Sequence, residues 1–253
     1  MSPQPALDWW ASYFNDDYLL EHHPMFTERR NRREAGRALD VLGLPVGARV
    51  LDVPCGQGRH ARLFAGAGMH VTGVDYSAHL LSHARAATRG SGVKYVRADM
   101  RRLPQSLSGK FDAVVSLGAS FGFFATPAED DATVASYARA LVPGGQLVLH
   151  AANRDGVMAR FIEKDWWRAD DGTLVLHERE FDPVSAILTV YVVLQRRADS
   201  RQRAYRMRLY TASELAAMFA RHGLTLTEAC DGWRDAPLRR RSGEMLLVAS
   251  RTH

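Results

Sequence analysis

The chain has 253 residues, of which 46% are apolar and 24% charged, so it is expected to bury a globular core rather than to be disordered. Its formal net charge of +5 permits an anionic partner without requiring one. Residues 1–10 lack a secretory pattern, and the longest apolar stretch (111–125) is interrupted by serines and glycines, so no membrane span is expected. Two cysteines are too few for a disulfide scaffold. A soluble, cytoplasmic protein is therefore expected.

The N-terminal part of the chain predicts helices. Aromatic residues recur at roughly helical spacing from residue 8 onward, and residues 28–40 predict a charged helix that ends at the turn 43–47. The pattern then alternates. Strands are expected over 49–53, 70–74, 93–97, 111–117 and 146–151, with helices over 58–66, 77–88 and 128–141. Alternation of this kind builds parallel β-α-β units.

After residue 153 three strands are predicted in succession, over 173–181, 187–195 and 203–209, which favours antiparallel hairpins. A helix over 211–222 and two strands over 224–229 and 244–250 follow, and these strands are expected to rejoin the main sheet. The predicted fold is α/β, with a doubly wound, mostly parallel seven-stranded sheet. Residues 1–45 would form a helical cap, 46–154 and 211–253 the core, and 155–210 an antiparallel substrate lid.

The most informative segment is 50–59, where a strand runs into a glycine loop that opens a helix. Gly56 and Gly58 allow the backbone to approach a ligand closely. The loop also fits the dinucleotide pattern, so a nicotinamide-dependent oxidoreductase is one alternative. However, Asp52 at the strand end would repel a pyrophosphate and suits a ligand that carries an ammonium group. Asp75, after the second strand, is placed to accept hydrogen bonds from both hydroxyls of a ribose.

In order along the chain, residues 51–58 (LDVPCGQG), 71–77 (VTGVDYS), 98–100 (ADM), 111–115 (FDAVV) and 141–145 (LVPGG) resemble the motifs of the class I S-adenosylmethionine-dependent methyltransferases. The resemblance is strong over about residues 45–153. The N-terminal segment resembles that of the family members that act on small molecules. Pro54 stands where the family usually has glycine, which would stiffen the loop.

This resemblance implies S-adenosyl-L-methionine as the cofactor. It also implies that the N-terminal helices fold over the cofactor and that an arginine of the second helix, Arg33 in preference to Arg29, binds its carboxylate. The expected cofactor-binding residues are Tyr13, Arg33, Asp52, Pro54, Gly56, Gly58, Asp75, Tyr76, Ser77, Asp99, Met100, Leu117 and Gly118.

The acceptor is expected at the carboxyl ends of the fourth and fifth strands, where such sheets bind ligands. His150, at the end of the fifth strand, is the candidate general base, with a hydrogen-bonded core histidine as the other interpretation. No set of three or four suitably spaced ligands predicts a metal site. The expected substrate-binding residues are Trp10, Ser120, Phe121, Trp166 and Arg206.

The leading hypothesis is a small-molecule N- or O-methyltransferase that acts as a monomer or homodimer. An RNA or protein methyltransferase is an alternative, favoured by the sequence pI near 9.5, although no appended RNA-binding module is apparent and no nucleic-acid partner is expected. A NAD-dependent oxidoreductase and a non-catalytic cofactor-binding protein remain further alternatives.

Overall fold

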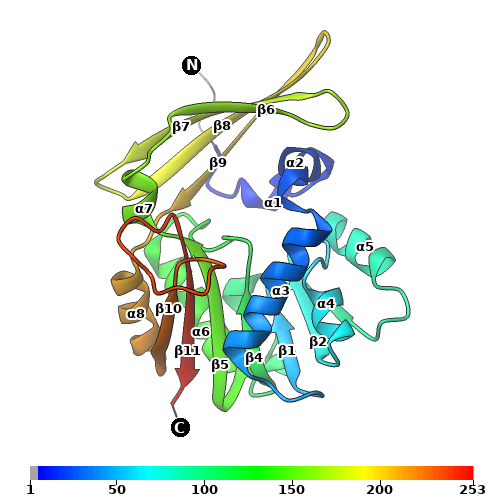
Figure 1. Ribbon diagram of the computed structural model, residues 1–253, viewed down its shortest axis with the longest axis vertical. Coiled ribbons are helices and arrows are strands. Elements are labelled where there is room, and N and C mark those ends of the chain that lie inside the picture. The colour runs from blue at the N-terminus through cyan, green and yellow to red at the C-terminus, as the bar shows by residue number, and fades with distance from the viewer. Residues whose placement is uncertain (1–4, 253) are drawn as a thin grey trace.

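Two β-sheets organise the computed structural model, which describes residues 5–252. The larger sheet has seven strands in the order β10-β11-β5-β4-β1-β2-β3 (Figure 1). Its strands run parallel except for β11, which is antiparallel to both of its neighbours. The seven strands are β1 (Arg49–Asp52), β2 (His70–Asp75), β3 (Lys94–Arg97), β4 (Phe111–Ser116), β5 (Leu141–Ala152), β10 (Leu224–Cys230) and β11 (Glu244–Arg251).

Helices cover both faces of this sheet and bury two separate apolar clusters. Helices α3 (Glu28–Leu42) and α4 (Ala61–Gly66) pack on one face, and α6 (Pro127–Ala140) and α8 (Ala212–Arg221) pack on the other. Helix α5 (Ala78–Ala87) contacts β2 and β3. The doubly wound α/β architecture predicted from the sequence is therefore confirmed. None of the helices described is long and apolar enough to cross a membrane.

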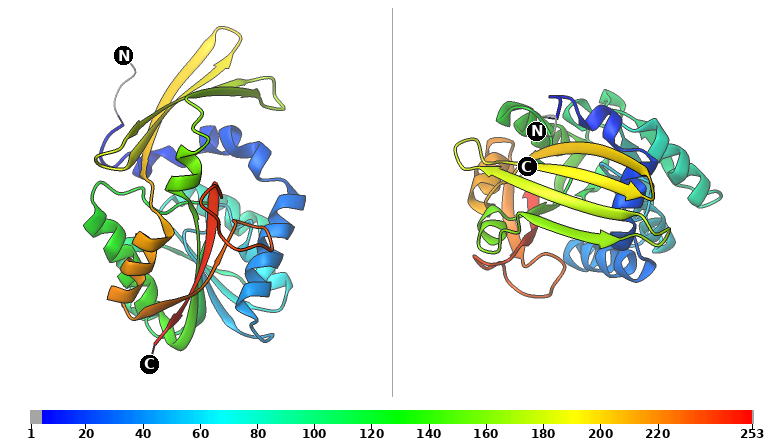
Figure 2. Two further views of the ribbon diagram at one scale, coloured as in Figure 1. Left: turned by 60° about the vertical axis from the view of Figure 1, so that its left-hand side comes forward. Right: turned by 90° about the horizontal axis from the view of Figure 1, so that it is seen from above.

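The second sheet is antiparallel and consists of β6 (Lys164–Arg168), β7 (Leu174–Asp182), β8 (Ile187–Arg196) and β9 (Asp199–Arg208). Figures 1 and 2 show it as a separate layer beyond the carboxyl ends of the main strands. The sequence predicted three of these strands and missed β6. This five-residue strand lacks a simple apolar alternation and pairs only with β7 at the edge of the sheet.

The glycine loop is longer than the sequence indicated. Helix α4 begins at Ala61 rather than at residue 58. Gly56 and Gly58 have φ angles of +54° and +77°, which are not helical, so the helix begins only beyond them. Short helical turns complete the chain, namely η1 (His23–Met25), η2 (Met100–Arg102), η3 (Gln105–Leu107) and α7 (Arg154–Met158).

The chain enters and leaves the second sheet at one point of the core. Asn153, after β5, forms an isolated bridge with Tyr210, after β9. The Tyr210 hydroxyl donates to the buried Asp130 carboxylate of α6 at 2.8 Å. The backbone N–H of Arg208 donates to the carbonyl of Gly122 at 2.7 Å, so the loop after β4 holds the end of β9.

Residues 5–27, called here the N-terminal segment, lie between the two sheets and contain α1 (Trp10–Tyr13) and α2 (Asp16–His22) (Figure 1). The Trp9 ring lies 5.0 Å from the ring of Phe123 in the core and 5.6 Å from that of Tyr205 on β9. The segment therefore packs against both layers through aromatic side chains.

A buried carboxylate adds polar contacts between the N-terminal segment and the second sheet. Glu21 of α2 accepts a hydrogen bond from the Tyr13 hydroxyl at 2.7 Å. Its carboxylate also lies 3.3 Å from His177 Nε2 of β7 and 3.6 Å from the guanidinium of Arg203 of β9. Burial opposes ionisation, but contacts with His177, His22 and Tyr13 outweigh it and lower the pKa of Glu21.

Gly122→Ala should detach the second sheet from the core. The Gly122 φ of +93° strains any larger residue, and a Cβ there would stand 2.3 Å from the carbonyl oxygen of Arg208. Gly144→Ala is the matched control, because Gly144 has a φ of +75° and open space around its Cβ position. Urea unfolding should show a loss of about 1–2 kcal/mol for the control and at least about 2 kcal/mol more for Gly122→Ala. Equal losses would contradict this anchoring role.

Candidate active site

A cavity of about 270 Å³ lies at the carboxyl ends of β1, β2, β4 and β5. The strand order reverses between β1 and β4, so the loops after these two strands diverge and leave a crevice between them. The N-terminal segment and the inner face of β9 contribute the remaining walls. Of the residues predicted from the sequence, those on its walls are Trp10, Tyr13, Pro54, Gly56, Asp75, Tyr76, Asp99, Met100, Leu117, Gly118, Ser120 and His150.

Asp75 lies on the wall of the cavity beside the glycine loop. Its side chain accepts hydrogen bonds from the backbone N–H of Gly56 and of Ser77, each at 2.8 Å. Ser77 does not line the cavity; it caps α5, and its hydroxyl donates to the Phe14 carbonyl at 2.8 Å. Burial raises the pKa of Asp75 to about 6. One carboxylate thus joins the loop after β1 to the start of α5.

The two glycines of the loop have different roles. Gly56 lines the cavity and has space around its Cβ position, with the nearest atom 4.0 Å away. Gly58 faces away from the cavity, and a Cβ there would stand 2.5 Å from the Tyr95 hydroxyl and 3.1 Å from Ala84. Gly58 therefore allows the loop to pack against β3 and α5.

Asp52 lies behind the loop and is almost fully buried, at 1% exposure, rather than on the cavity wall. Among the residues described, no group donates a hydrogen bond to either carboxylate oxygen. Burial raises the pKa of Asp52 to about 7, with Arg59 opposing the rise and Asp75 adding to it. Asp52 therefore does not contact a ligand in the cavity directly, and near pH 7 its carboxyl group is only partly ionised.

The arginines on the cavity are not the one predicted. Arg33 lies further along α3, is exposed, and lines a separate hollow with Arg160 and Trp233. Arg30 and Arg59 line the cavity instead. Arg59 directly follows the glycine loop in the sequence, and this position was the signal that could have identified it.

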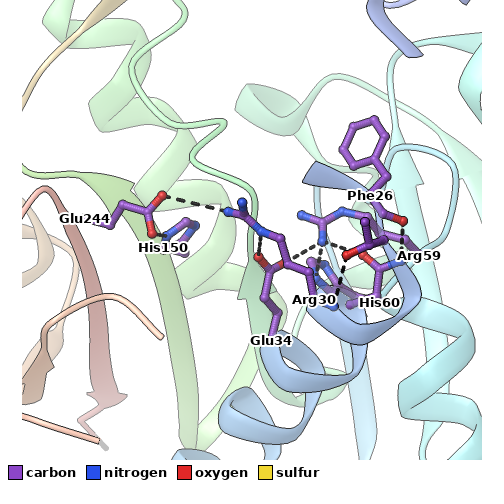
Figure 3. Close-up of polar contacts among 9 residues, drawn as sticks. Phe26, Arg30, Glu34, Arg59, His60, His150 and Glu244 are labelled. Atoms are coloured by element: carbon purple, nitrogen blue, oxygen red, sulfur yellow. Dashed lines mark hydrogen bonds and ion pairs between the residues drawn. The ribbon is translucent and has the colours of Figure 1, made fainter. Parts of the chain in front are cut away.

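Glu34 of α3 holds both of these arginines (Figure 3). Arg30 Nε donates to it at 2.6 Å, and Arg59 Nη1 and His60 Nε2 contact its other oxygen. Despite burial, hydrogen bonds with His60 and Arg59 lower the pKa of Glu34. The pair of guanidinium groups is thus fixed in position beside the glycine loop, where a ligand carboxylate can be bound.

His150 and Glu244 extend this cluster along the cavity, because the Glu244 carboxylate also lies 3.9 Å from the guanidinium of Arg30 (Figure 3). His150 Nε2 lies 3.4 Å from the Glu244 carboxylate, and its ring lies 4.5 Å from that of Trp233. Contact with His150 lowers the pKa of Glu244, against the effect of burial. The sequence missed Glu244. It pairs with Ala152 across β5 and β11, which places its side chain diagonally beside His150 on the same face.

The second sheet contributes different residues from those predicted. Tyr205 and Met207 of β9 line the cavity. Arg206 lies between them, and because side chains alternate along a strand it points to the opposite face. Trp166 of β6 is 66% exposed and also lies away from the cavity. Phe121 is 3% exposed and packs in the core against Tyr210 instead of facing the cavity.

Asp52→Asn should change how stability depends on pH. An unfolded aspartate loses its proton near pH 4, whereas Asp52 in the folded chain keeps it until about pH 7. The folded chain then binds more protons in this window, so Asp52 lowers the free energy of unfolding as pH rises. From pH 5 to 7 the variant should gain about 2–3 kcal/mol relative to wild type. The exposed Asp40→Asn is the control. If the difference in free energy of unfolding between Asp52→Asn and wild type did not change with pH, the raised pKa of Asp52 would be refuted.

Residues 50–145 match a family model described as a methyltransferase domain. A dTDP-3-amino-3,4,6-trideoxy-alpha-D-glucopyranose N,N-dimethyltransferase of Streptomyces venezuelae is 34% identical over 140 residues, which cover 52% of this chain and 57% of the relative. The glycine/sarcosine N-methyltransferase of Halorhodospira halochloris is 34% identical over 112 residues, covering 44% and 42%. The chain thus spans about half the length of these curated relatives.

Solved structures extend the similarity over most of the chain. CalS10, an amino pentose methyltransferase of Micromonospora echinaspora with SAM bound, has a TM-score of 0.69 at 29% identity and covers 88% of this chain and 92% of its own. The CcbJ methyltransferase of Streptomyces caelestis has a TM-score of 0.77 at 22% identity, with 88% and 90% covered. The chain therefore carries a methyltransferase domain over residues 50–145 and has the fold of the class I S-adenosylmethionine-dependent methyltransferases, as its motifs predicted.

Proposed function

We propose that this protein is an S-adenosylmethionine-dependent methyltransferase that methylates a nitrogen or oxygen atom of a small molecule. The observation that carries the proposal is one cavity with Asp75 on one wall and the His150–Glu244 pair on another. The first group suits a nucleoside, and the second suits an acceptor that must lose a proton. The names of the similar proteins support small acceptors, since they act on amino sugars and on glycine or sarcosine.

The residues of the cavity fit the cofactor. Asp75 accepts backbone hydrogen bonds from Gly56 and Ser77 and is also in contact with the backbone of Tyr76, and a carboxylate has about four acceptor positions, so a position is left for a ribose hydroxyl. Met100 and Leu117 offer apolar surface to an adenine. Asp99 is less available than the sequence indicated, because Arg101 binds its carboxylate at 2.6–3.1 Å.

The carboxylate of the cofactor would be bound by Arg59 and Arg30, and the positive charge of its sulfonium would be favoured by two kinds of group. Asp75, whose pKa of about 6 leaves it mostly ionised at pH 7, supplies negative charge near the loop, and Asp52 adds to this charge only in part. Aromatic side chains of the N-terminal segment, among them Trp10, Tyr13 and Tyr18, line the cavity, and aromatic rings attract cations. When bound, S-adenosylmethionine supplies an electrophilic methyl group.

His150 is proposed to take a proton from the acceptor on its imidazole, so that an ammonium attacks as the neutral amine nitrogen or a hydroxyl attacks through its oxygen as it loses the proton. Glu244, 3.4 Å away, would stabilise the resulting imidazolium. The aromatic contacts of Trp9 with Phe123 and Tyr205 close the N-terminal segment over the cavity and exclude water. Positioning and exclusion of water are the main demands of a direct displacement.

We also propose that residues 1–45 act as a cap, that 155–210 act as a substrate lid on the core formed by 46–154 and 211–253, and that the protein works in the cytoplasm as a monomer or homodimer. The second sheet supplies Tyr205 and Met207 to the cavity, which supports a lid, and Cys55 and Cys230 are free thiols, which suits a reducing compartment. Asp52, directly before the loop, and the aromatic side chains of the N-terminal segment that line the cavity speak against a dinucleotide and hence against the oxidoreductase alternative.

Asp75→Asn should weaken S-adenosylmethionine binding by about 10–100-fold, since a hydrogen bond to a charged group contributes about 1.5–3 kcal/mol. The measurement is isothermal titration calorimetry, with Asp40→Asn, an exposed aspartate on α3, as the control. Wild-type affinity should also fall as pH drops through about 6, because the pKa of Asp75 is raised to that value and a protonated carboxyl loses an acceptor position. The Asn variant should not show this fall below pH 6. Unchanged affinity in the variant would remove Asp75 from the cofactor site.

His150→Ala should lower kcat by about 10²–10⁴-fold when the acceptor arrives protonated. Glu244→Gln should lower it less, because His150 remains. Cofactor affinity by calorimetry should change little in either variant, and the exposed His70→Ala is the control for loss of a histidine. Wild-type kcat in His150→Ala, measured across a panel of small amines and alcohols, would show that positioning alone suffices and that His150 is not the base.

A further inference from the structure

Three side chains with metal-ligating atoms meet on the surface where the N-terminal segment contacts α5. Asp16 begins α2, and His79 and His83 lie one turn apart on α5. One ligand atom from each residue lies within 4.8 Å of the others. The two histidine rings have centroids 4.8 Å apart, as expected for an i, i+4 pair on one helix face.

The distances suit a tetrahedral ion. Zinc binds imidazole nitrogen and carboxylate oxygen at about 2.0–2.1 Å, which places neighbouring ligand atoms of a tetrahedron about 3.3 Å apart. The Asp16 Oδ1 atom lies 3.0 Å from His79 Nε2 and 3.9 Å from His83 Nε2, values on either side of this spacing. All three side chains are partly exposed, at 82%, 36% and 46%, so an ion can enter and retain a water as its fourth ligand.

The partners of Asp16 also favour an ion. In the described part of the chain its carboxylate pairs with the two histidines and with no lysine or arginine. The adjacent Asp17 instead pairs with Arg201. A carboxylate that faces two imidazoles provides the mixed oxygen and nitrogen ligand set that zinc prefers.

We propose that Asp16, His79 and His83 bind a divalent transition-metal ion, best matched by zinc, and that the ion fastens the N-terminal segment to α5. The ligands come from two segments that the Ser77 hydroxyl already links through the Phe14 carbonyl. Trp10 and Tyr13, just before Asp16, line the cavity. A bound ion would therefore hold the N-terminal segment closed over the cavity. The effect of this on the ligand rests on the proposed function.

The test of the site is calorimetric titration of zinc into the untagged, EDTA-treated full chain without cofactor. One ion per chain should bind to wild type. His83→Ala and Asp16→Asn should each weaken binding by at least about tenfold, since loss of an outer-shell partner alone costs about 10–100-fold. His70→Ala, at the start of β2, should leave the affinity unchanged. No binding to wild type, or equal affinity in wild type and His83→Ala, would overturn the site.

The fastening is tested separately through release of S-adenosylhomocysteine by stopped flow. Zinc should slow release from wild type, EDTA should reverse the effect, and His83→Ala should show neither change. Zinc binding without slower release would refute the fastening and leave the site. Failure of S-adenosylhomocysteine to bind at all would refute the proposed function, whereas the calorimetric result on zinc would still stand.

Discussion

The reversal of strand order between β1 and β4 is the constraint on which the rest of the molecule depends. Parallel strands bring all their carboxyl ends to one edge, and the reversal sends the connections from these two strands in opposite directions. The crevice between them receives Asp75, the last residue of β2, and His150, near the end of β5, because both strands end at this edge. Both side chains face the cavity because their strands end there.

Charge is unevenly distributed around this crevice. Asp52 and Asp75 are buried on the β1–β2 side, and burial raises the pKa of each. Arg59 and Arg30 lie nearby, but Glu34 holds both and offsets part of their charge. Near pH 7 the site therefore combines the negative charge of Asp75, to which Asp52 adds only in part, with guanidinium groups fixed at the edge of the loop. A zwitterionic ligand that carries an added positive charge fits this pattern better than a dianionic pyrophosphate does.

The cover of the cavity is built from contacts that join segments distant in sequence. Trp9 contacts Phe123 and Tyr205, and Glu21 gathers polar groups from the second sheet inside the protein. If one of these partners moved away from Glu21, charged groups would remain buried without a partner, and this costs more free energy than the intact cluster does. The N-terminal segment and the second sheet are thus coupled, and movement of one requires rearrangement of the other.

The sequence by itself determined the features that depend on local signals. The alternation of strands and helices, the presence of a glycine loop after the first strand and the acidic strand ends all appear in the structure, although the loop runs three residues further than predicted. Only the tertiary structure decided which side chains meet. Antiparallel pairing of β11 with β5 brings Glu244 to His150, and the single-residue alternation of β9 turns Arg206 away while Tyr205 faces inward. Contacts of this kind depend on register and on strand neighbours, which local periodicity does not encode.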